Sequence, residues 1–167
     1  VEPQSNEMFL LVERFVEIYK AHGIERTQIS RFLGDESGLK PADLRSDETL
    51  LHALSEKLLN DTCSHFGIAR EWLDGKDVPI YPYLSYDKNL HGFIDFLESL
   101  NVEFDDVEGY AIKCENDELS RDDDRYPIAF VFRGKIDHWG SPGKESIWRH
   151  YPLNDTLYWG YTRTRLQ

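Results

Sequence analysis

The chain has 167 residues, of which 13% are aromatic and 30% charged, and its formal net charge is −12 at pH 7. So many aromatic side chains exclude an intrinsically disordered chain, and no apolar run approaches the roughly 20 residues that a membrane-spanning helix needs. The excess of acidic residues argues against sequence-blind binding to nucleic acid, which requires clustered Lys and Arg side chains.

Residues 6–78 predict an all-helical domain. Their apolar residues recur at spacings of three and four, as on the buried face of a helix. Ser46 and Thr49 belong to a capping signal at the start of the longest segment, and we expect this longest helix to be broken near Ser55. The predicted helices cover residues 6–21, 26–33, one turn within 39–44, 46–66 and 69–73.

The sequence predicts two domains, residues 1–78 and 79–167. Between them, Gly75 and Pro79 bracket charged residues, a composition typical of a linker. The N-terminus is polar and acidic, so we expect neither a signal peptide nor a transit peptide.

Residues 79–167 contain most of the aromatic residues and predict one helix followed by strands. The helix covers 88–100, and its expected buried face consists of Leu90, Phe93, Ile94, Leu97 and Leu100. The predicted strands cover residues 108–114, 128–132, 146–153 and 157–164. The expected fold class is therefore α+β, with a helical bundle followed by one helix packed on a small antiparallel sheet.

Two stretches carry a family resemblance: RTQISRFLG at 26–34 and LLNDTCSHFGIAREWLDG at 58–75. Together they resemble the lambda-repressor-like (Xre/Cro-type) helix-turn-helix family over residues 6–78. In such a bundle Cys63 is small enough for close helix packing, Gly67 turns the chain, and Trp72 closes one end. The resemblance implies a transcriptional regulator that binds DNA as a dimer.

In that family the second helix grips phosphate at its start, and the next helix reads bases in the major groove. When the family's contacts are transferred by position, the resemblance implies that Arg26, Thr27 and Gln28 contact phosphate, with Arg31 nearby. It implies contacts to bases or flanking backbone by Ser37, Lys40, Asp43 and Arg45. The segment 35–54 departs from the family because it is longer than usual and opens with two acidic residues, which phosphate repels.

Two functions from different classes remain open. The first is a DNA-binding regulator whose second domain dimerises or senses a ligand. The alternative is a protein-interaction module with a degenerate helix-turn-helix that no longer binds DNA, supported by the net charge and the atypical segment 35–54. An enzyme ranks third, because no catalytic set of residues stands out.

The aromatic residues of 79–167 are too many for a small one-sided sheet to bury alone. Three places for them stay open: the core beneath the predicted helix, a dimer surface, and a small-molecule pocket. The candidates for a ligand site or subunit interface are Tyr110, Trp139, Trp148, Tyr151 and Trp159.

Two cysteines, Cys63 and Cys114, lie far apart in the chain. They are too few for a disulfide framework and too widely spaced for a typical metal site. We therefore expect a reduced, cytoplasmic protein without a metal or cofactor. The family resemblance implies a homodimer with DNA as its partner, and we expect any small-molecule or protein partner at the C-terminal domain and no membrane.

Overall fold

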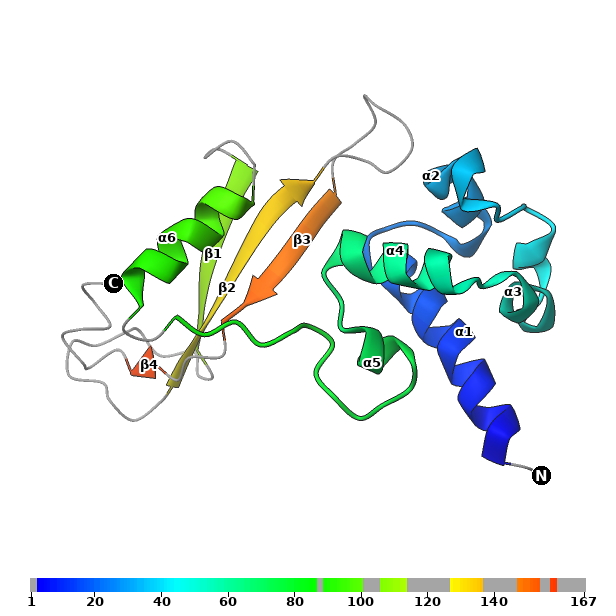
Figure 1. Cartoon of the computed structure of the whole chain (residues 1–167), viewed down its shortest axis with the longest axis horizontal. Helices are drawn as coiled ribbons and strands as arrows, with labels where there is room; N and C mark the ends of the chain where they lie inside the picture. The colour runs from blue at the N-terminus through cyan, green and yellow to red at the C-terminus, as the bar shows by residue number, and fades with distance from the viewer. Residues whose placement is uncertain are drawn as a thin grey trace. The chain divides into compact units, whose positions relative to one another are not determined.

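A computed structural model of the chain (Figure 1) describes residues 3–86, 89–100, 106–113, 127–136, 147–153 and 157–158. The chain divides into two compact units, Val1–Pro82 with Ile136–Arg149 and Tyr83–Lys135 with His150–Gln167. The predicted α+β fold class is confirmed, because helices dominate the N-terminal half and an antiparallel sheet follows. None of the described helices has the length and apolar character that crossing a bilayer requires.

The first unit is built from five α-helices, among the residues described, and short 3₁₀ turns. The α-helices are α1 (Pro3–Ala21), α2 (Ile29–Leu33), α3 (Asp47–Ala53), α4 (Glu56–Phe66) and α5 (Arg70–Leu73). The 3₁₀ turns are η1 (Arg26–Gln28), η2 (Asp35–Ser37) and η3 (Asp43–Arg45). Helix α1 contacts α3, α5 and η1, so it is the element around which this unit is organised.

Tyr19 lies at the centre of the helical core and is fully buried. Its ring meets Phe32 and Phe66 edge to face, with centroids 5.8 and 5.2 Å away. Its hydroxyl is hydrogen-bonded to Thr62 Oγ1 at 2.9 Å, which satisfies the one polar atom of the ring. Burial raises the pKa of the Tyr19 phenol well above its usual value.

The predicted break near Ser55 is confirmed, since α3 and α4 are separate helices. Leu54 leaves the helical conformation with ψ 99°, and the Ser55 side chain caps α4 by accepting from the backbone N–H of Leu58 at 3.2 Å. Helix α4 ends at Gly67, whose φ of +70° is the left-handed conformation that glycine adopts without strain.

The sheet contains β1 (Val107–Lys113), β2 (Pro127–Ile136), β3 (Ile147–Pro152) and β4 (Leu157–Tyr158). The strand order is β1-β2-β3, with β4 pairing antiparallel to the start of β2. Strands β1 and β2 are antiparallel over their whole paired length, from Val107 opposite Gly134 to Lys113 opposite Ile128. Figure 1 shows β2 and β3 running in opposite directions.

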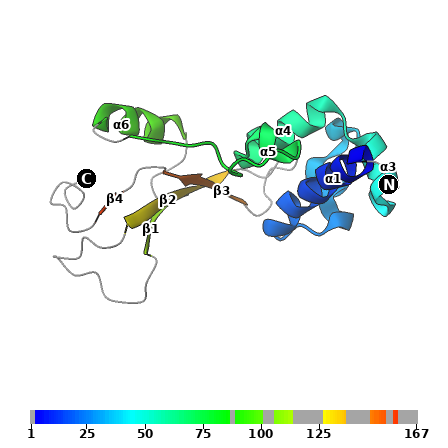
Figure 2. The same cartoon turned by 90° about the horizontal axis from the view of Figure 1, so that it is seen from below.

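Helix α6 (Leu90–Ser99) lies on one side of the sheet (Figure 2). The ring of Phe93 packs against Phe132 of β2, and the ring of Phe96 packs against Tyr151 of β3, both at 5.3 Å between centroids. The prediction that Leu90 and Ile94 belong to the buried face of this helix is wrong, because they are 64% and 42% exposed. The aromatic rings bury more area than the aliphatic side chains, and their partners on the sheet set the rotation of the helix.

Candidate functional site

The family resemblance implied base contacts by residues of the segment between α2 and α3, and this segment contains no α-helix. Helix α2 ends at Gly34, which has φ +74°, and the chain then forms η2 and η3 with irregular backbone between them. A recognition helix needs consecutive turns to lay several side chains along the major groove. Two isolated 3₁₀ turns do not provide such a row.

Two of the predicted base-contacting residues serve the local turns. The Ser37 hydroxyl donates to the Gly34 carbonyl at 2.8 Å and accepts from the backbone N–H of Leu39 at 3.3 Å. The Asp43 carboxylate accepts from the backbone N–H of Lys40 at 2.9 Å. These side-chain-to-backbone bonds stabilise the short turns locally.

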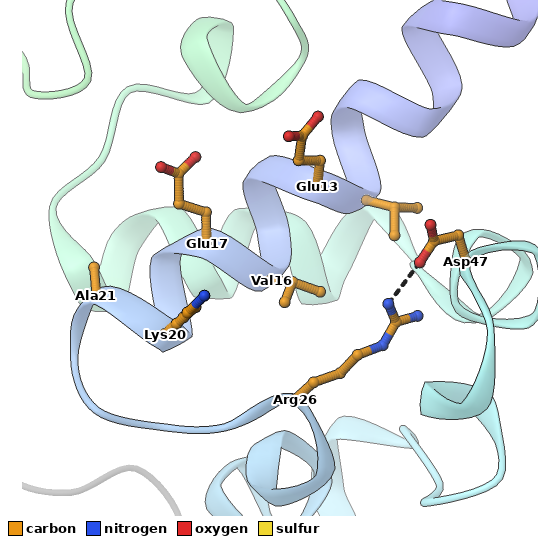
Figure 3. Close-up of a pocket in the computed structure, with 8 residues that line it drawn as sticks. Glu13, Val16, Glu17, Lys20, Ala21, Arg26 and Asp47 are labelled. Atoms are coloured by element: carbon orange, nitrogen blue, oxygen red, sulfur yellow. Dashed lines mark hydrogen bonds and ion pairs between the residues drawn. The ribbon is translucent and has the colours of Figure 1, made fainter.

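Arg26, the first of the residues predicted to contact phosphate, forms its side-chain contacts within the helical unit. Its guanidinium Nη1 forms an ion pair with Asp47 Oδ1 at 2.5 Å, drawn in Figure 3, and its Nε donates to the Leu44 carbonyl at 2.9 Å. The side chain of Gln28 accepts from the backbone N–H of Glu25 at 3.0 Å within a capping box. The Arg26 side chain therefore connects η1 to η3 and α3, and the Gln28 side chain stabilises the start of η1.

The other predicted DNA-contacting residues are exposed: Thr27, Arg31, Lys40 and Arg45. Within the described residues, no ion pair involves the side chains of Arg31, Lys40 or Arg45. Acidic side chains at 25, 35 and 36 are exposed in the same stretch. The surface around 25–45 consequently carries charges of both signs.

A groove beside α1 is a feature that the sequence did not predict (Figure 3). It has a volume of about 650 Å³ and lies between α1 and the Arg26–Asp47 ion pair. Its lining consists of Val12, Glu13, Val16, Glu17, Lys20, Ala21, Arg26 and Asp47. The available signal was a Val-Glu pair at 12–13 that recurs four residues later at 16–17, a spacing that amphipathic helices of any kind share.

The groove combines an apolar surface with carboxylates on one edge. Val12 is buried and Val16 half-buried, and Figure 3 shows Val16 on the side of α1 that faces Arg26. Glu13 and Glu17 are exposed one helical turn apart, and neither forms an ion pair with a described residue. Like charges at this spacing repel each other.

Tyr110 lies on the face of the sheet opposite α6. Gly109 is adjacent to Phe132, which packs under α6, so the side chain of the next residue points the other way. The guanidinium of Arg133 lies 5.0 Å from the Tyr110 ring centroid and 2.6 Å from Glu108 Oε2. Hydrogen bonds from Tyr110 and Arg133 lower the pKa of the Glu108 carboxyl.

The other aromatic candidates do not join Tyr110. Tyr151 packs against Phe96 beneath α6, on the opposite face of the sheet, and Trp148 is half-buried. Trp139 and Trp159 lie outside the described residues. In the described part of the chain, no group of three or more His, Cys, Asp or Glu residues is arranged to hold a metal ion.

Comparison of the chain with protein-family models, curated proteins and solved structures finds no match.

Proposed function

We propose that this chain is a protein-interaction module whose helical unit has a helix-turn-helix-like sequence but does not read DNA bases. The observation that carries this proposal is that the predicted base-contacting residues lie in the segment between α2 and α3, which forms two 3₁₀ turns and no α-helix. Two of its polar side chains, Ser37 and Asp43, are used to hold those turns.

Charge supports the same proposal. A DNA-binding domain concentrates cations on one face, because neutralising phosphates supplies most of its affinity. Here Arg26 is neutralised by Asp47, the remaining cations of 25–45 are interspersed with exposed carboxylates, and the whole chain carries a net charge of −12. A surface of mixed charge suits a protein partner, whose own charges can be complementary.

A DNA-binding dimeric regulator is the second candidate, and one observation favours it. Arg31, Lys40 and Arg45 are exposed and form no ion pair with any described residue. These three side chains would be free to contact phosphate oxygens.

Selection of genomic fragments by the purified chain tests the two candidates against each other. The full chain and its Arg31→Ala/Lys40→Ala/Arg45→Ala variant are incubated with sheared genomic DNA at about 50 and 150 mM salt, and the retained fragments are sequenced. We expect no site to be enriched by the unsubstituted chain alone at either salt concentration. Enrichment of a few sites by the unsubstituted chain, lost when the three cations are removed, would establish the DNA regulator instead.

A further inference from the structure

We propose that the α1 groove, lined by Val12 to Ala21 of α1 together with Arg26 and Asp47, binds a basic amphipathic helix of a partner protein. This inference rests on the proposed function, and it names the surface used and the chemistry of the partner. It requires neither the sheet nor the segment between α2 and α3.

The dimensions and chemistry of the groove favour a helix as its occupant. Its α1 wall runs from Val12 to Ala21, which is about 14 Å at 1.5 Å per residue. That length matches about two and a half turns of a second helix packed alongside. An extended peptide would need a strand edge for its backbone hydrogen bonds, whereas the groove is bounded by helical elements, and a helix satisfies its own backbone.

The charges of the groove favour a basic partner. Glu13 and Glu17 border it one turn apart without an ion partner among the described residues, so Lys or Arg side chains at a spacing of four on a partner helix can pair with both. The third carboxylate, Asp47, is already paired with Arg26. The partly exposed Val16, on the side of α1 that faces Arg26, supplies the apolar contact that anchors such a helix.

The same charges argue against anionic occupants. A phosphate or an acidic peptide would meet the carboxylates of Glu13 and Glu17 along one edge of the groove, and like charges brought together across an interface oppose binding. The nearby cations do not offset this, since the charge of Arg26 is balanced by Asp47 and Lys20 is a single side chain.

A titration with designed peptides tests the assignment on the full chain. The probe is a fluorescein-labelled amphipathic helix of about 14 residues, with Leu on one face and Lys at flanking positions spaced by four. The matched probe has Glu in place of Lys. We expect saturable, salt-sensitive binding of the Lys peptide by fluorescence polarisation, with the Glu peptide bound at least about tenfold more weakly.

Two charge-reversal variants separate the groove from the overall charge of the chain. Glu13→Lys/Glu17→Lys should weaken binding of the Lys peptide about tenfold, because two ion pairs become two repulsions. The control, Glu71→Lys/Asp77→Lys, changes the net charge equally at exposed positions outside the groove. It should leave the affinity within about twofold.

Equal weakening by both variants, or the absence of saturable binding, would overturn the groove assignment. The proposed function fails by a different result, which is enrichment of genomic fragments that depends on Arg31, Lys40 and Arg45. The peptide titration and the fragment selection use different variants, so the two failures are distinguishable.

Discussion

At the scale of single residues, Arg26 was predicted to contact phosphate, and the structure gives its side chain partners within the helical unit. Its ion pair with Asp47 joins η1 to the start of α3, across 21 residues of chain, and its hydrogen bond to the Leu44 carbonyl joins η1 to η3. Its side chain is 30% exposed, so the ion pair is partly screened by solvent. In the structure Arg26 connects η1 with η3 and α3.

Arg26→Ala should therefore reduce stability. We expect the free energy of unfolding to fall by about 1 kcal/mol, because an ion pair and a hydrogen bond to a backbone carbonyl are lost together. Urea denaturation followed by circular dichroism measures the change. Arg31→Ala, which also removes one positive charge but no described ion partner, should change the free energy by less than about 0.5 kcal/mol. Equal effects of the two substitutions would contradict the structural role of Arg26.

At the scale of elements, the sequence predicts best those features that neighbouring residues determine. The break between α3 and α4 is visible in the sequence because Ser55 and the backbone N–H that it caps are three residues apart. The rotation of α6 about its own axis is not visible in the sequence, because it depends on Phe132 and Tyr151, which lie far along the chain. Arg26 is recognisable as a cation in the sequence, but its partner Asp47 is identified only by the fold.

Removing the cap at the start of α4 should destabilise the helical unit. Ser55→Ala leaves the backbone N–H of Leu58 without its side-chain acceptor, and we expect a loss of about 1 kcal/mol in the free energy of unfolding. Ser64→Ala is the matched control, since Ser64 is exposed within α4 and alanine favours a helix interior. Thermal and urea unfolding of both variants give the comparison. A Ser64→Ala variant as destabilised as Ser55→Ala would show that the cap contributes little.

At the scale of the whole molecule, we propose that the chain forms a homodimer through the sheet. Tyr110 and Ile112 are 42% and 52% exposed on β1, which lies at the end of the described strand order. Exposed apolar residues on an end strand are a common route to association between copies of a chain. In such a homodimer Tyr110 and Ile112 would lie in the interface, and a single substitution tests this.

Ile112→Arg should shift the chain towards monomer, because it places a charge in the proposed interface. Sedimentation velocity over a range of protein concentrations measures the shift. Ile94→Arg is the control, since Ile94 is exposed on α6, across the sheet from Ile112, and its substitution should leave the association unchanged. A wild-type chain that stays monomeric at high concentration, or one that Ile94→Arg disrupts equally, would contradict the sheet as the interface.

We propose above all that the helical unit binds a protein and does not read DNA bases. A photo-crosslinking amino acid placed at Arg45, in the segment that would face DNA, and at Glu17, in the α1 groove, tests it most directly in living cells. We expect protein adducts of discrete mass from position 17, and no nuclease-sensitive adduct from position 45. Nuclease-sensitive adducts from position 45, with none to protein from position 17, would contradict it.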